Sequence, residues 1–164
     1  MASMIARTAL LPLVTVAGLA LVAPRTSEAC ECTGWKGLEE SVEKAPAAVV
    51  GRVLGHGNAV GIEGVAFLYV KVIDSIKGPK NGTTIRVWDT KVGSTCSLEL
   101  EGLAPDSIAV FALWQSQPAN RERLPVRPGD YLLGACGEYF RKMESEAVAH
   151  AWATRARQRG KSTR

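Results

Sequence analysis

The sequence predicts a mainly β fold: a small barrel of five strands, with a short helix before it and a longer helix after it. Five runs rich in β-branched and aromatic residues are separated by turn-forming residues. Apolar residues recur with helical spacing on either side of these runs. The length of 164 residues suits one compact domain. Five short strands with helical flanks are typical of an OB-like Greek-key barrel, closed or partly open.

The first helix is expected at residues 36–45, KGLEESVEKA, because Leu38 and Val42 lie four residues apart on one face. Pro46 limits this helix. The five strands are expected at residues 48–55, 65–76, 83–90, 107–115 and 130–136. The run 65–76 predicts a strand most strongly, because apolar side chains alternate on both of its faces.

The second helix is expected at about residues 138–157, where apolar residues recur every four positions from Tyr139 to Ala151. The chain has a net charge of +4, and residues 141–164 carry seven basic and two acidic side chains. The basic end, residues 155–164, is expected to be a solvated and frayed terminus. Its charge also suggests attraction to a polyanionic surface.

The first 29 residues predict a secretory signal peptide. Arg7 is followed by an apolar run at 10–23, and Ser27-Glu28-Ala29 offers the small residues of a cleavage site. The apolar run is too short for a membrane span, and a glutamate at position 28 fits a lipoprotein signal poorly. We therefore expect cleavage after Ala29, with Cys30 as the first mature residue, and a secreted or extracytoplasmic location in the periplasm or at the cell surface.

All four cysteines follow this leader; they are Cys30, Cys32, Cys96 and Cys136. An even number of cysteines in an exported chain indicates disulfides. A bridge between Cys30 and Cys32 would close a small, strained ring. We therefore expect each of these two to pair with a distant cysteine, and the residues alone leave both crossed pairings open. A four-thiolate zinc site is the alternative, but an exported chain does not favour free thiolates and only one pair is closely spaced.

The sequence contains no serine nucleophile elbow, phosphate-binding loop or HExxH motif. Its two histidines, His56 and His150, have no partner motif and are expected to be surface residues, in a glycine-rich turn and on the last helix. Asp89 and Asp130 are expected to have ordinary strand-end or turn roles. We therefore expect a protein that is not an enzyme and has no cofactor, no nucleic-acid partner and a monomeric state.

Several of these features occur together in one known family. The Cys-x-Cys pair at 30–32 is followed by a short helix, VVGRV, a strand ending in IKG, a cysteine after Gly-Ser-Thr, and YLLGAC. This order resembles the netrin-like N-terminal domain of the tissue inhibitors of metalloproteinases, and in particular its single-domain bacterial members. The resemblance covers residues 30 to about 140, with 141–164 as a helix end and basic tail. It implies an OB-like barrel and the disulfides Cys30–Cys96 and Cys32–Cys136.

The resemblance also implies a function, inhibition of a metalloendopeptidase. The free α-amine and carbonyl oxygen of Cys30 would bind the catalytic zinc of the partner protease, which keeps one coordination position open. The implied protease-binding ridge consists of Cys30, Glu31, Cys32, Thr33, Gly34, Ser94, Thr95 and Cys96. Glu31 stands where the animal inhibitors have threonine or serine, and Gly34 where proline is common. The alternative is a non-inhibitory extracellular binding module that contacts a protein or a polyanion through its basic tail.

Overall fold

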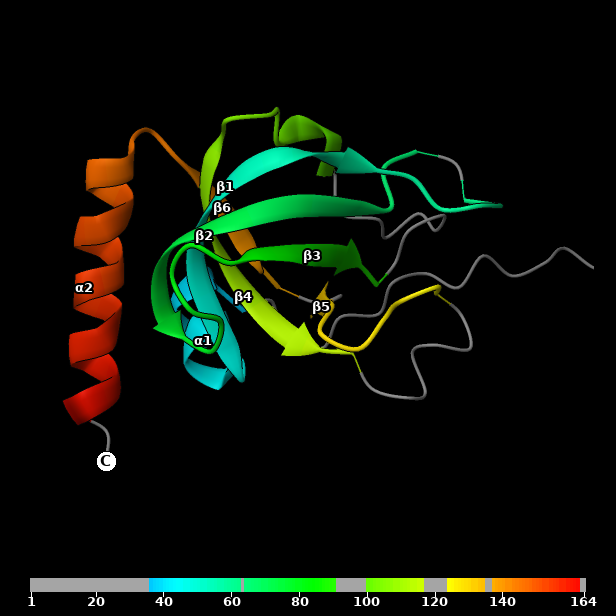
Figure 1. Ribbon diagram of the computed structural model, residues 1–164. Helices are drawn as coiled ribbons and strands as arrows, with labels where there is room; N and C mark the ends of the chain where they lie inside the picture. The colour runs from blue at the N-terminus through cyan, green and yellow to red at the C-terminus, as the bar shows by residue number, and fades with distance from the viewer. Residues whose placement is uncertain (1–35, 63, 91–99, 117–123, 135–136, 163–164) are drawn as a thin grey trace, which may run out of the picture.

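The computed structural model describes residues 36–62, 64–90, 100–116, 124–134 and 137–162. Its main body is a closed barrel of five strands in the order β1, β2, β3, β5 and β4, closed by pairing between β4 and β1, with α2 standing against one side (Figure 1). The elements are α1 (Leu38–Lys44), β1 (Ala47–Gly57), β2 (Phe67–Lys77), β3 (Thr84–Asp89), the 3-10 turn η1 (Leu100–Gly102), β4 (Ile108–Gln115), β5 (Tyr131–Leu133), β6 (Phe140–Met143) and α2 (Glu146–Ser162). The predicted OB-like barrel with one short and one longer helix is confirmed.

The strand pairing explains how one sheet closes on itself. Neighbouring strands run antiparallel except β3 and β5, which are parallel, with Val87 opposite Tyr131 and Asp89 opposite Leu133. The pairing of β1 with β2 shifts register at three places. Such bulges bend a strand and increase its twist. Because β1 bends, it can pair with β2 on one edge and β4 on the other, and the barrel closes.

The barrel interior is filled by apolar side chains that alternate along the strands. In β2, Leu68, Val70 and Val72 are almost fully buried, whereas Tyr69 and Lys71 are exposed. Successive side chains of a strand point to opposite faces of the sheet. The alternation that predicted this strand therefore separates an inward face from an outward face.

A second, smaller apolar cluster lies on the outer side of β2, β3 and β5. Phe67 and Trp88, whose rings lie 4.5 Å apart, pack there with Leu132 of β5 and with Leu124 and Val126 from the segment before it. In OB folds this outer face and its neighbouring loops are the usual ligand site. In this chain the segment before β5 covers part of that face.

Asp130 links β3 to the segment before β5 beside this outer cluster. Asp130 is 5% exposed, and its carboxylate accepts hydrogen bonds from Arg86 Nε (2.9 Å) and Nη2 (2.7 Å) and from Trp88 Nε1 (2.9 Å). It also accepts one from the backbone N–H of Arg127 (2.7 Å), while the Arg86 guanidinium lies over the Phe67 ring. The turn role expected for Asp130 is therefore accompanied by a buried bridge between β3 and the start of β5.

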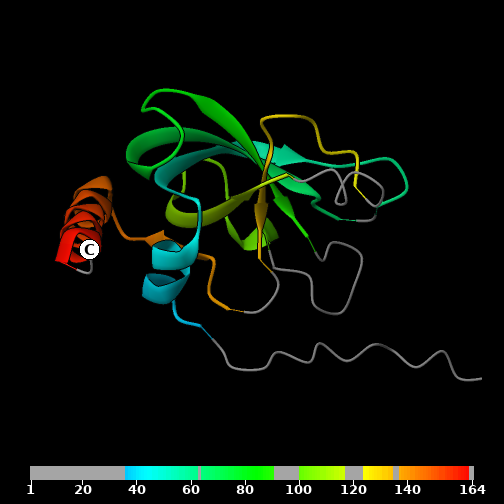
Figure 2. The same cartoon turned by 90° about the horizontal axis from the view of Figure 1, so that it is seen from below.

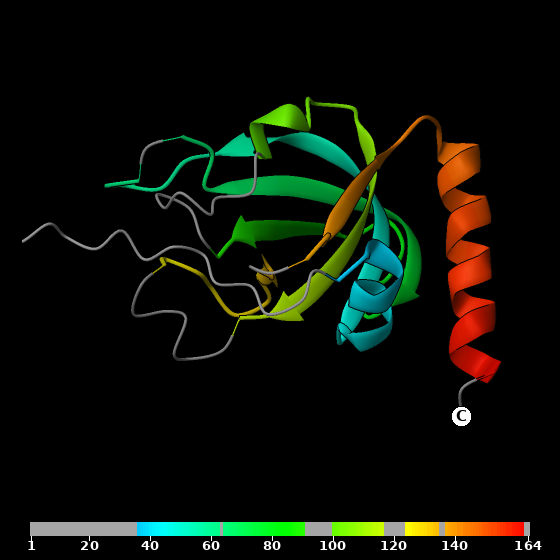
Figure 3. The same ribbon diagram turned by 180° about the vertical axis from the view of Figure 1, so that it is seen from behind.

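The helix expected at 138–157 is wrong at its start. The structure has the strand β6 there, paired antiparallel with β4, and the helix begins only after Ser145 (Figure 3). A spacing of four between Tyr139 and Met143 fits the two-residue period of a strand as well as a helical turn. Ser145 then marks the helix start, because its Oγ accepts the backbone N–H of Val148 at 3.3 Å.

The frayed terminus expected at 155–164 is also corrected as far as the structure describes it, because α2 continues as a helix to Ser162. Arg157 explains why. Its Nη1 donates to Asp74 Oδ1 at 2.8 Å and to the carbonyl oxygen of Ser75 at 3.2 Å. These contacts attach the C-terminal half of α2 to β2, so the basic residues stand on a docked helix.

Candidate functional site

The predicted protease-binding ridge lies outside the residues that the structure describes, and so do all the cysteines and both predicted disulfides. The residues concerned are Cys30, Glu31, Cys32, Thr33, Gly34, Ser94, Thr95, Cys96 and Cys136. The residues that border these segments are described, however, and they show where each segment joins the barrel.

The chain that follows the Cys-x-Cys pair is anchored beside the chain that follows Cys136. The backbone N–H of Glu138 donates to the carbonyl oxygen of Lys36 at 2.8 Å. A Cβ atom at Gly137 would lie only 3.0 Å from the same oxygen, and Gly137 has a positive φ of 149°. Residue 36 and residues 137–138 are therefore in direct contact, and glycine is required for this close approach.

The end of β3 lies at the same place. Thr90 Oγ1 donates to the carbonyl oxygen of Leu133 at 2.9 Å. Gly134 then packs against the ring of Tyr139, since a Cβ atom there would lie 2.3 Å from the ring Cζ. Each of the three cysteine-bearing segments therefore has a flanking described residue in the region around Tyr139. We call this region the cysteine end; it consists of Lys36, Thr90, Leu133, Gly134, Gly137, Glu138 and Tyr139.

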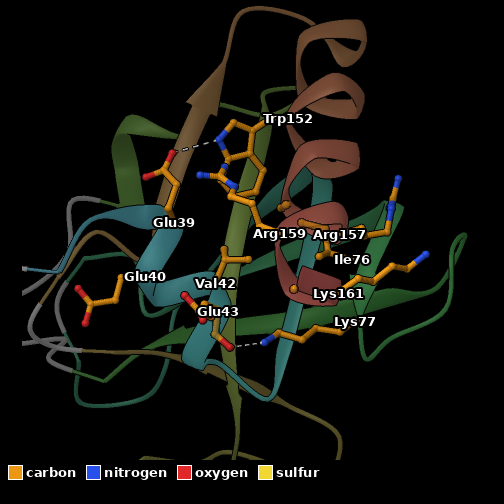
Figure 4. Close-up of a pocket in the computed structure, with 12 residues that line it drawn as sticks. Glu39, Glu40, Val42, Glu43, Ile76, Lys77, Trp152, Arg157, Arg159 and Lys161 are labelled. Atoms are coloured by element: carbon orange, nitrogen blue, oxygen red, sulfur yellow. Dashed lines mark hydrogen bonds between the residues drawn. The ribbon is translucent and has the colours of Figure 1, made fainter. Parts of the chain in front are cut away.

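A groove of about 1000 Å³ lies between α1, α2 and the end of β2 (Figure 4). Figure 2 shows the two helices on the same side of the barrel. The groove has an apolar floor and charged walls, acidic on the α1 side and basic on the other. The floor residues are Val42, Ile76, Trp152 and Ala156; the wall residues include Glu39, Glu40 and Glu43 from α1, Lys77 from β2, and Arg157, Arg159 and Lys161 from α2.

An ionic cluster holds α2 against the barrel beside this groove. His150 Nδ1 lies 2.9 Å from Asp74 Oδ2, and Arg157 donates to both oxygens of the same carboxylate, to Oδ1 at 2.8 Å and to Oδ2 at 3.2 Å. On the far side of the imidazole, Nε2 lies 3.5 Å from Glu146 Oε1. Arg52 of β1 pairs with Glu146 through Nη2 at 2.9 Å. Two barrel strands therefore each contribute one charged residue to the docking of α2.

Each charged group of this cluster stabilises the ionised form of its neighbour. Burial raises the pKa of Asp74, but hydrogen bonds from Arg157 and His150 outweigh it, so its pKa lies below the ordinary value of 3.8. The hydrogen bond to Asp74 raises the pKa of His150 above its ordinary value of 6.5, against a smaller effect of burial. Sequence reasoning missed this cluster; the available signal was an acidic residue, Asp74, directly after the apolar pair Val72-Ile73 of a mostly apolar strand.

His56 lies elsewhere than expected. The structure places it within β1, not in the glycine-rich turn, with Nε2 at 2.9 Å from the carbonyl oxygen of Leu103. Within the described ranges, no group of three or more histidine, cysteine, aspartate or glutamate residues is placed to hold a metal ion. Neither α1 nor α2, the helices in the described part of the chain, is long and apolar enough to cross a membrane.

Comparison with known proteins adds no further constraint. No family model and no curated protein matches this sequence.

Proposed function

We propose that this chain is an exported netrin-like domain that inhibits a zinc metallopeptidase through the α-amine and carbonyl oxygen of Cys30. The observation that supports the proposal is the cysteine end, where the described borders of the three cysteine-bearing segments lie together on a closed OB-like barrel. A site needs rigid supporting elements to hold a reactive group in place. The barrel offers such a support for a short N-terminal segment.

The reach of the chain is compatible with the proposed disulfides. Cys32 lies four residues before Lys36, and four extended residues span at most about 14 Å. Cys136 directly precedes Gly137, which touches Lys36. Because a disulfide needs Cα atoms within about 7 Å of each other, a Cys32–Cys136 bridge is within reach. Cys30 would then pair with Cys96, the order that the family resemblance implies, although reach alone also allows the opposite pairing.

The proposed chemistry requires a free, immobile N-terminus. An α-amine has a pKa of about 8, so a useful fraction is neutral and able to bind zinc at neutral pH. The amine and carbonyl oxygen of Cys30 form a compact chelate for the open position of a catalytic zinc. Two disulfides would hold this chelate still and lower the entropy cost of binding. Thr33, Ser94 and Thr95 would complete the contact surface beside it.

The test compares two forms of the exported chain: the native form and one with a single alanine inserted before Cys30. Intact-mass measurement should first show a native chain that begins at Cys30 and carries no lipid. Non-reducing peptide mapping should show the same disulfides in both forms. Inhibition constants are then measured against a panel of zinc peptidases. We expect the native form to inhibit and the extended form, whose amine is displaced, to lose inhibition. Equal inhibition by both forms, or by neither, would overturn the proposal.

The alternative function, an extracellular binding module, is supported by one observation. Arg155 and Lys161 are exposed on α2, which is docked to the barrel, so their charges are presented on a rigid helix. Binding of a sulfated oligosaccharide should then weaken with salt. It should also weaken in an Arg155→Gln, Lys161→Gln variant, with Lys142→Gln as the matched control.

A further inference from the structure

The groove between α1 and α2 takes no part in the Cys30 mechanism. We propose that it binds an amphipathic helix of a partner protein, with lysine or arginine along one edge of the apolar stripe and aspartate or glutamate along the other. This inference is independent of the proposed inhibition, because the groove and the cysteine end share no residue.

The floor of the groove is suited to apolar side chains. Val42 and Trp152 are 4% and 7% exposed, and both belong to the main core. Ile76 and Ala156 are partly buried and pack against the same core. Because Val42 and Trp152 are already almost fully covered, the apolar surface that a partner would remove from water is mainly that of Ile76 and Ala156, and the gain is roughly in proportion to this small area. The Trp152 indole N–H donates to Glu39 at 3.3 Å, so the ring is held in position before any partner arrives (Figure 4).

The walls determine which charges the partner must carry. At one end of the groove, Lys77 of β2 extends toward α1, where its Nζ donates to the backbone carbonyl oxygen of Glu43 at 2.8 Å (Figure 4). The side chains of Glu43 on α1 and Lys161 on α2 are both exposed there. Neither of these two side chains forms an ion pair with any residue that the structure describes. A partner with a cation facing Glu43 and an anion facing Lys161 would pair both. Residues at the edges of coiled-coil helices pair across an apolar seam in the same way.

The α1 wall disfavours a polyanion that would fill the whole groove, whereas the opposite wall is basic. Glu39 and Glu40 of that wall are paired with Arg141 and Lys44, but an anion beside Glu43 would meet a like charge, which is costly in an interface. An amphipathic helix in a groove is a common mode of recognition. Because α1 has only seven residues, the contact covers about two turns. Such a small interface belongs to the weak and transient class.

The test uses the full mature chain and three synthetic helical peptides with the same apolar stripe. One peptide has lysine on one edge and glutamate on the other, one has lysine on both edges, and one has glutamate on both. Binding is followed by amide shifts in NMR spectra. The mixed peptide should bind the native chain most tightly. Glu43→Lys should weaken the mixed peptide and strengthen the all-glutamate peptide, each about fivefold, and Lys161→Glu should strengthen the all-lysine peptide instead.

Both substitutions change exposed side chains, so the fold should be retained, and unchanged spectra outside the groove check this. The matched controls are Glu144→Lys and Lys142→Glu, which make the same charge changes at exposed positions away from the groove. They should leave the order of the three peptides unchanged. The proposal is overturned if the mixed peptide binds no better than the other two. It is also overturned if no peptide binds and a sulfated oligosaccharide instead binds the native chain but not Lys161→Glu.

Discussion

Replacing Asp130 with alanine should strongly destabilise the barrel without altering the cysteine end or the groove. The carboxylate accepts four hydrogen bonds of 2.7–2.9 Å, from Arg86, Trp88 and the backbone of Arg127. Alanine would leave a guanidinium, an indole N–H and a backbone N–H without their acceptor. Because Asp130 is only 5% exposed, water cannot readily take its place.

The expected cost follows from these contacts. Removing one partner of a buried ion pair costs about 3–5 kcal/mol. The Arg86 side chain is 18% exposed, so water can partly solvate its charge once Asp130 is gone. The cost of leaving Arg86 unpaired is therefore near the lower end of this range. The lost indole and backbone hydrogen bonds add about 1 kcal/mol each. We therefore expect the free energy of unfolding to fall by about 5 kcal/mol, a large fraction of the 5–15 kcal/mol that is usual for a domain.

Denaturant unfolding followed by tryptophan fluorescence and circular dichroism measures this cost. The midpoint should fall with an unchanged slope, since the surface exposed on unfolding stays the same. Asp130→Asn keeps an acceptor oxygen but loses the charge, and it should cost about half as much. Glu144→Ala removes an exposed carboxylate and should change the stability by less than about 0.5 kcal/mol. A cost below about 1 kcal/mol for Asp130→Ala would contradict a role of this carboxylate in holding β3 to the start of β5.

Three further changes test other parts of the proposal. Glu31→Thr should tighten inhibition of metallopeptidases with an apolar specificity pocket about tenfold, because a carboxylate no longer has to lose its water; unchanged inhibition constants would contradict this. Reducing the proposed disulfides should lower the free energy of unfolding by about 4 kcal/mol per bridge, and an unchanged unfolding midpoint would speak against them. Asp74, whose pKa is lowered in the folded state, contributes to the free energy of unfolding above pH 3.8, and this contribution is lost as the pH falls through the lowered pKa. His150, whose pKa is raised in the folded state, makes its full contribution to the free energy of unfolding below pH 6.5, and this contribution is lost as the pH rises through the raised pKa. Unfolding measured across pH should therefore show that His150→Gln costs stability mainly at mildly acidic pH, and an equal cost at pH 9 would contradict the charged contact.

Elements whose pattern is local could be predicted from the amino-acid sequence. Two-residue alternation located β2, and the four-residue spacing of Leu38 and Val42 located α1. Five strands between helical segments then pointed to the barrel, which the structure confirms. These features are readable from neighbouring residues because one buried face imposes its period on the chain.

Tertiary structure decided what depends on distant partners. The spacing of Tyr139 and Met143 fits a strand and a helix equally well, and only pairing with β4 makes this segment β6. Asp74 and Arg157 are 83 residues apart, and Asp130 and Arg86 are 44 apart. An isolated aspartate in a sequence does not reveal which cation it will meet. Closing the barrel and docking α2 bring these charges together. The same packing creates the groove, which no local sequence pattern predicts.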